Sequence, residues 1–191
     1  MTSVENRACK AIRSTPILFR TFQRTSAGAD AVVASLATFY AREEIGLSEL
    51  LQIGRAKLFK VQDPERIERN LRGNTDSEVR LASRNAFRAP NDEAAVASLQ
   101  SLKGVKIAVG SAILSWCFPD RWPVMDRHAW RALSEFGLVR PRPADLPFTV
   151  SDYGQYCVVV RLLAANLERR PQEIDAWLYS FGKCGLTSAD I

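Results

Sequence analysis

Apolar residues recur along this chain at the spacing of amphipathic α-helices, and no segment alternates cleanly as a β-strand. Side chains three and four positions apart share one face of a helix, so each run predicts a helix with a buried stripe. Gly, Pro and capping residues mark the ends of the runs. The predicted helices span about residues 29–46, 48–59, 64–73, 76–87, 92–102, 126–137, 152–167 and 171–181, with one more inside a hairpin of about residues 93–118. The residues predicted to cap or open them include Ser48, Asp76, Asp92, Asp126, Asp152 and Pro171.

This pattern predicts an all-α fold. The run Val158–Val160 is β-prone, but the longer apolar stripe around it favours a helix. Residues 1–28 form a basic N-terminal segment, interpreted as frayed or docked on the fold, or as an arm lying along DNA, and residues 29–191 form the helical domain. The prolines of residues 141–147 predict a surface loop inside that domain rather than a linker.

Composition and charge narrow the function classes. Hydrophobic residues make up 47% and charged residues 25% of the chain, which is ordinary for a globular protein. The formal charge of +5 suits a phosphate backbone, although many basic proteins bind no nucleic acid. No apolar run reaches the roughly 18 residues of a membrane span, and the start of the chain lacks the apolar core of a signal peptide. We therefore expect a cytoplasmic protein without a membrane partner.

The cysteines argue against a metal centre. They are scattered and include no CxxC pair, so we expect reduced thiols and neither a zinc site nor an iron–sulfur cluster. The four positions are Cys9, Cys117, Cys157 and Cys184.

The stretch Leu102–Gly137 carries the clearest chemistry. A turn containing Gly104 joins two apolar helices, and the second helix begins with small residues that let the pair approach closely. Such a turn can be a plain structural corner, or it can aim the free N–H groups of the second helix at one phosphate. A Pro-marked aromatic loop follows, and Asp126 then opens the next helix.

These parts resemble the helix-hairpin-helix DNA glycosylase superfamily. Leu102, Gly104 and Val105 match its hairpin, and Val124–His128 matches its apolar-apolar-Asp-x-His pattern. The run Glu173–Leu178 looks like the closing helix of glycosylase-like members. The resemblance implies two helical lobes with an active-site cleft between them, and double-stranded DNA with a damaged or modified base as the partner. The DNA-binding residues it implies are Lys103, Gly104, Val105, Lys106 and Ala108.

Two departures from the family pattern change what the resemblance implies. Lys106 replaces the second glycine of the hairpin, which either strains the turn or adds a positive charge beside the phosphate. Ala108 stands where the bifunctional members carry a catalytic lysine, and alanine cannot form a Schiff base. The implied enzyme is therefore a monofunctional glycosylase, a monomer without lyase activity or cofactor. No metal-ligating side chains are identified, and the sequence leaves open whether hairpin carbonyl groups bind a metal ion.

Asp126 is the predicted catalytic residue. A carboxylate near C1′ can stabilise the oxocarbenium-like transition state and activate a water molecule, and a helix N-terminus favours the ionised form that this requires. By spacing alone, Asp126 is also an ordinary N-cap. His128, the single histidine, is interpreted as a packing residue and Asp175 as a buttress or a cap.

A glycosylase must also hold the extruded base in a pocket, where aromatic side chains can stack on it. The candidates are Trp116, Phe118 and Trp122, of which Trp122 lies in a Pro-flanked loop; Trp130 and Trp177 are interpreted as core. Two other functions fit parts of the pattern: a catalytically inactive helix-hairpin-helix DNA-binding module, and a helical scaffold that uses the hairpin as a corner.

Overall fold

The computed structural model describes residues 2–14, 39, 41–58, 64–143 and 145–185, and within them every regular element is a helix. The all-α prediction is confirmed for this part of the chain. Most of the predicted helix 29–46 lies outside it, as do residues 15–28 and Phe59. The prediction is wrong for residues 41–46, which form a turn, a bend and irregular chain instead of helix. The helices are α1 (Ser3–Ser14), α4 (Leu47–Leu58), α5 (Pro64–Arg72), α6 (Asp76–Phe87), α7 (Asp92–Gln100), α8 (Ile107–Cys117), α9 (Arg127–Glu135), α10 (Val150–Leu167) and α11 (Pro171–Lys183).

Several helices are capped by a residue that lies one or more positions before the acidic residue that was expected to cap them. Thr75 and Thr149 are the N-caps of α6 and α10, because their extended backbone places the hydroxyl group on the N–H three residues later. Asn91 caps α7 in the same way. The expected caps therefore lie inside the helices, where Asp152 completes the capping box of α10. Ser48 lies inside α4 as well.

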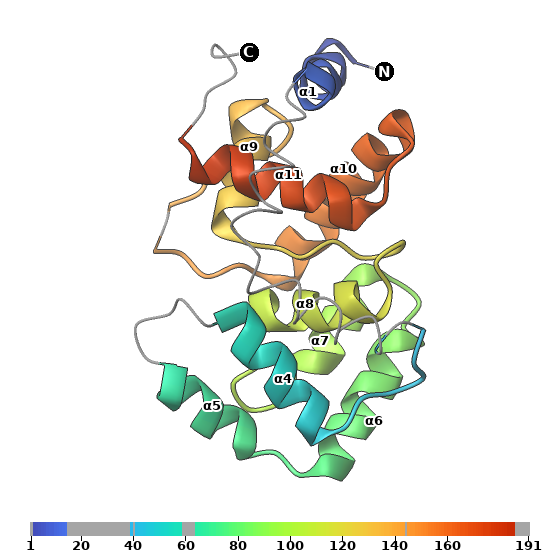
Figure 1. Cartoon of the computed structure of the whole chain (residues 1–191), viewed down its shortest axis with the longest axis vertical. Coiled ribbons are helices and arrows are strands. Elements are labelled where there is room, and N and C mark those ends of the chain that lie inside the picture. The colour runs from blue at the N-terminus through green and yellow to red at the C-terminus, as the bar shows by residue number, and fades with distance from the viewer. Residues whose placement is uncertain (1, 15–38, 40, 59–63, 144, 186–191) are drawn as a thin grey trace.

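The helices form two groups (Figure 1). Helices α4, α5, α6, α7 and α8 make one group, called the α4–α8 group below, and helices α9, α10 and α11 make the other, called the α9–α11 group. Helix α1 packs on α10, and α7 joins the groups through its contacts with α10. The extended segment between α8 and α9 runs between the two groups. Helix α1, at the N-terminal end of the described chain, is thus docked on α10.

Helix α8 is apolar on nearly all sides because it lies in the interior, packed against α4 and α7. Its small residues let α7 approach closely, as the sequence predicts. A Cβ atom at Gly110 would lie 3.1 Å from Cγ2 of Val96, which is tighter than most side-chain contacts. A side chain at this position would require Val96 to shift by a few tenths of an ångström.

The core of the α9–α11 group is aromatic. Trp177 and Phe181 stack with ring centroids 5.1 Å apart, and Phe136 of the α9 C-terminus packs on both. Gly182 lets α11 meet α9 at the backbone, because a Cβ atom at this position would lie only 2.0 Å from the carbonyl oxygen of His128. Throughout the described chain, each helix is too short or too polar to span a bilayer.

Replacing Gly182 with alanine tests this contact. Gly to Ala inside a helix ordinarily stabilises a protein, but here the new methyl group overlaps the backbone of α9. We expect the free energy of unfolding to fall by about 3 kcal/mol, measured by urea denaturation. The control Lys183→Ala changes the next residue, which is exposed, and should alter it by no more than about 0.5 kcal/mol. Equal stability of the two variants would contradict the close approach.

Candidate functional site

The turn between α7 and α8 is tight and depends on Gly104. The N–H group of Val105 donates to the carbonyl oxygen of Leu102 over 3.2 Å, and Gly104 has φ +80°, a conformation that glycine adopts without strain. A Cβ atom there would also lie 3.0 Å from Cβ of Asn70. The backbone conformation therefore favours glycine strongly at this position, and the limited space adds to the preference.

Helix α5 and the residues after it hold the turn. The Asn74 side chain accepts from the N–H group of Lys103 over 2.8 Å and donates to the Lys103 carbonyl oxygen over 3.0 Å, so it grips both sides of this residue. The Lys103 ammonium group donates to the carbonyl oxygen of Gly73 over 3.0 Å. The orientation of the turn is thus set by contacts within the α4–α8 group.

Lys106 takes the N-cap position of α8. Its φ of −102° is open to any residue, so a lysine causes no backbone strain at this position. The Lys106 side chain is exposed and does not cap the helix. Ala108, in the first turn, is half-buried and presents only a methyl group. Of the two effects expected of Lys106, backbone strain is absent, and a positive charge beside a bound phosphate stays a prediction.

Asp126 is the N-cap of α9, as its spacing predicts. Its Oδ1 atom accepts from the N–H groups of His128 over 2.7 Å and Ala129 over 3.0 Å. The Oδ2 atom lies 3.9 Å from Nζ of Lys57, at the end of α4, and the two side chains are 18% and 16% exposed. One carboxylate oxygen therefore binds the helix, while the other faces an amine from the α4–α8 group.

Sequence reasoning missed Lys57. It lies far from Asp126 along the chain, in the last turn of an ordinary amphipathic helix, where a basic residue is common. No local pattern distinguishes it from other surface lysines. Only the packing of the α4–α8 group against the segment that carries Asp126 brings the two side chains together.

The segment Pro123–Met125, which leads into Asp126, is held by side chains from other helices. The N–H group of Met125 donates to Oγ of Ser111 on α8 over 3.0 Å. The hydroxyl group of Tyr153 on α10 donates to the carbonyl oxygen of Pro123 over 3.2 Å. Buried backbone outside a helix needs such partners, and they fix its position.

Val124 is held at both its N–H and its carbonyl group. The N–H group donates to Oδ2 of Asp175 on α11 over 3.3 Å, and the carbonyl oxygen lies 3.2 Å from the Tyr156 hydroxyl group. The same hydroxyl group lies 2.9 Å from Oδ1 of Asp175. Asp175 lies inside α11 and supports the Val124 backbone, so it does not cap a helix. The signal for this role was a carboxylate on an otherwise apolar helix face.

Asp175 is in an unusual electrostatic environment. Burial raises the pKa of its carboxyl group to about 8, and the nearby charge of Asp126 adds to the rise. The ammonium group of Lys57 and the hydrogen bonds from Tyr156 and Val124 act in the opposite direction. Two carboxyl groups and one amine thus form a cluster around the start of α9.

The Trp122 side chain is fully buried, which contradicts the prediction that it lines a base pocket. Its side chain is 0% exposed, and its indole N–H group donates to Oδ1 of Asp92 over 2.9 Å. The guanidinium group of Arg121 covers the ring, 4.0 Å from its centroid. The proline-flanked loop suggested exposure, but the loop turns its tryptophan into the core, so Trp122 cannot stack on a base in this structure.

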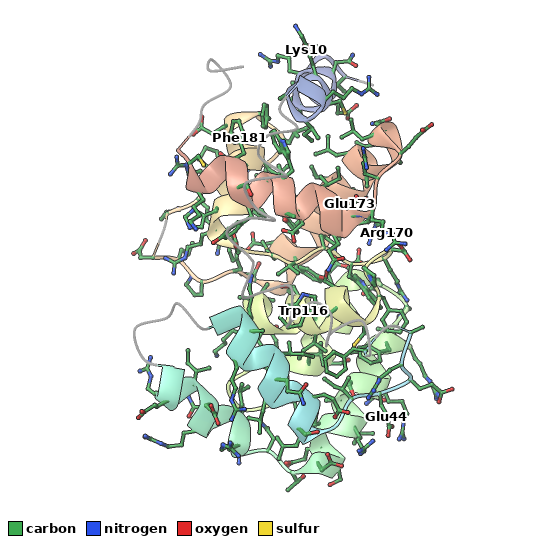
Figure 2. The ribbon with its side chains drawn as sticks, in the orientation of Figure 1. Lys10, Glu44, Trp116, Arg170, Glu173 and Phe181 are labelled. Atoms are coloured by element: carbon green, nitrogen blue, oxygen red, sulfur yellow. The ribbon has the colours of Figure 1, made fainter. Side chains whose placement is uncertain are left out.

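The other two aromatic candidates are half-buried. Phe118 packs edge-on against Phe87 and Trp122, with centroids 5.0 and 5.4 Å away. Trp116 lies on α8 near the middle of the molecule (Figure 2). In the same view, Arg170 and Glu173 mark the start of α11. Both candidates pack partly on the core, and Trp116 is the one on the central helix.

The remaining sequence interpretations concern structural residues. Trp130 and Trp177 are buried, as predicted. His128 packs edge-on against Tyr179, with centroids 5.4 Å apart.

The described residues contain no group of three or more His, Cys, Asp or Glu side chains that could hold a metal ion. Cys9, Cys117, Cys157 and Cys184 are free thiols, the first three buried and the last exposed.

No protein-family model, curated protein or solved structure matches this chain significantly.

Removing the Asp92 carboxylate tests the structural role assigned to Trp122. Asp92 also pairs with Arg161 over 2.5 Å, so Asp92→Ala leaves a half-buried cation and an indole N–H group without this acceptor. We expect a loss of about 3 kcal/mol in the free energy of unfolding. The control Glu43→Ala removes an exposed pair with Arg88 and should cost less than about 1 kcal/mol. An unchanged stability of Asp92→Ala would contradict the assignment.

Proposed function

We propose that this protein is a monofunctional DNA glycosylase that hydrolyses the N-glycosidic bond of a damaged or modified base in double-stranded DNA. The observation that carries the proposal is the Asp126 carboxylate: Oδ1 is bound to the N-terminus of α9, and Oδ2 faces Lys57. Such a group is rigid, partly shielded from water and directed away from its own helix. We further propose that the enzyme acts as a cytoplasmic monomer without a cofactor.

The proposed chemistry uses the charge of Asp126. As the base leaves, positive charge develops on the deoxyribose, and a fixed carboxylate stabilises it without having to reorient. The same carboxylate can orient and deprotonate the water molecule that attacks C1′. The target nucleotide must first leave the base stack, which costs a few kcal/mol.

In this proposal the two helix groups are the two lobes of the enzyme, and the active-site cleft is expected between them. The α4–α8 group provides Lys57 and the α7–α8 turn, and the α9–α11 group provides the Asp175 buttress behind Asp126. The first turn of α8, with the exposed Lys106 beside it, can bind one phosphate group of the DNA backbone. Trp116 and Phe118 are the aromatic candidates left for the base pocket.

Ala108 supports hydrolysis without strand cleavage, because the position that carries the amine in bifunctional relatives holds a methyl group. Lys57 is nevertheless a primary amine 3.9 Å from Asp126. Assays that count abasic sites should therefore be read both with and without alkali. Strand breaks that form without alkali would contradict the monofunctional proposal and direct attention to Lys57.

Asp126→Asn is the central test of the catalytic proposal. Asparagine caps helices about as well as aspartate, so the fold should persist while the charge is lost. With duplexes carrying damaged purines, deaminated bases or enlarged pyrimidines, we expect the wild type to release at least one of these bases. On that substrate the variant should release it about 100- to 1000-fold more slowly, with DNA affinity retained.

Asp126→Ala serves as the companion variant, since it removes both the cap and the charge and separates the two effects. Equal base release by the wild type and Asp126→Asn would exclude Asp126 as the catalytic group. DNA binding by the wild type without release of any base in the panel would favour the inactive DNA-binding module.

Reversing the charges of the turn tests its contact with phosphate. Lys103→Glu/Lys106→Glu should weaken binding to duplex DNA, and the slope of log affinity against log salt should become shallower by about 1 to 2, the effect of losing up to one phosphate contact per lysine. Lys106→Glu alone should give about half of this effect. The control Lys183→Glu, on an exposed site of α11, should leave the slope unchanged. Identical slopes for all variants would favour the turn as a structural corner.

A further inference from the structure

The hydroxyl group of Tyr156 lies between two oxygen atoms that both need a hydrogen. Oδ1 of Asp175 is 2.9 Å away and the carbonyl oxygen of Val124 is 3.2 Å away. Burial and the neighbouring carboxyl groups of Asp175 and Asp126 raise the pKa of Tyr156 well above its ordinary value, so the hydroxyl group keeps its proton. A tyrosine hydroxyl group nevertheless has one hydrogen to donate.

Counting hydrogens distinguishes the two protonation states of Asp175. If Asp175 is ionised, Tyr156 donates to it and the Val124 carbonyl oxygen gains no hydrogen from this hydroxyl group. If Asp175 is protonated, its O–H group donates to Tyr156, and Tyr156 donates to Val124. The N–H group of Val124 donates to Oδ2 of Asp175 in either state. The protonated state alone gives each of the three short contacts a hydrogen.

We propose that Asp175 is a neutral carboxylic acid at pH 7 and serves as a positioning residue for Asp126. The proposal rests on the glycosylase function proposed above. The neutral acid, the Tyr156 hydroxyl group and both backbone groups of Val124 form a closed ring of hydrogen bonds two residues before Asp126. This ring sets the direction from which the chain enters α9.

The titratable groups that face Asp175 come from three directions. Asp126 lies at the start of α9, Lys57 on α4, and the hydroxyl groups of Tyr153 and Tyr156 on α10. Burial and the charge of Asp126 favour the neutral acid, and the ammonium group of Lys57 opposes them. The balance raises the pKa of Asp175 to about 8.

Neutral Asp175 leaves one negative charge at the site, on the carboxylate that faces Lys57. Ionisation would remove the hydrogen that completes the ring and would place a second negative charge beside Asp126. Two carboxylates near one amine also change the field at the sugar. Base release by the wild type should therefore decline above about pH 8, by up to tenfold per pH unit for one ionisation.

Asp175→Asn tests this assignment, because asparagine reproduces the neutral acid. Its oxygen can accept from Val124, and its amino group can donate to Tyr156. We expect base release comparable to the wild type at pH 7 and no decline near pH 8. Tyr156→Phe breaks the ring without changing a charge and should slow release about fivefold across the pH range, the effect of one hydrogen bond.

A second measurement does not depend on activity. The folded-state pKa of Asp175 lies above its unfolded value of 3.8, so the stability from its proton is complete below about pH 4 and is lost as the pH rises to about 8. The unfolding constant of the wild type should therefore rise relative to Asp175→Asn by up to tenfold per pH unit between pH 5 and 8. Asp120→Asn, at an exposed carboxylate, should parallel the wild type.

The outcomes separate the two proposals. Parallel unfolding curves for the wild type and Asp175→Asn would overturn the neutral assignment, whether or not a base is released. Divergent curves without release of any base would support the neutral acid and count against the glycosylase. A folded Asp175→Asn that is as inactive as Asp126→Asn at pH 7 would also overturn the proposal, since it would make the charge of Asp175 necessary.

Discussion

The position of Asp126 depends on how the extended segment before it satisfies its backbone groups. This segment runs between two groups of helices, and Pro123–Met125 is itself neither helix nor strand, so no regular backbone hydrogen-bond pattern satisfies it. Its N–H and carbonyl groups are instead bound by Ser111, Tyr153, Tyr156 and Asp175, from helices α8, α10 and α11. Buried backbone that lost these partners would cost about 1–3 kcal/mol per group, so the segment is held strongly. The carboxylate of Asp126 is held in place in turn, because this residue follows the fixed segment directly and its Oδ1 atom binds the first turn of α9.

The same segment links the two helix groups. Just before it, the core tryptophan Trp122 donates to Asp92 at the start of α7, and Arg161 of α10 binds the same carboxylate. At its far end, Lys57 of α4 faces Asp126. The candidate site is therefore assembled from both groups, and a shift of one relative to the other would change the distance between the amine and the carboxylate. This dependence on packing explains why a residue at the end of α4 belongs to the site.

Electrostatics gives the cluster its asymmetry. Asp126 lies at a helix N-terminus, where backbone N–H groups stabilise a negative charge, whereas Asp175 lies inside α11 with its carboxyl group buried. Two carboxyl groups close together can divide the roles of anion and neutral acid when their surroundings differ in this way. In the proposed enzyme, the anion faces the sugar and the neutral acid holds the chain. The charge of Lys57 is then balanced by one carboxylate.

The sequence alone determined the features that depend on residues within about one helical turn. The helical class, the cap at Asp126, the turn at Gly104 and the close approach at Gly110 follow from periodicity, capping chemistry and residue size. The N-caps Thr75, Asn91 and Thr149 were not predicted from the sequence, because neighbouring polar residues compete for the cap position and the backbone conformation decides between them. The tertiary structure alone decided that Trp122 is buried, that Lys57 meets Asp126, and that Asp175 supports Val124. These contacts join residues from separate helices, and no spacing along the chain encodes which helices will pack together.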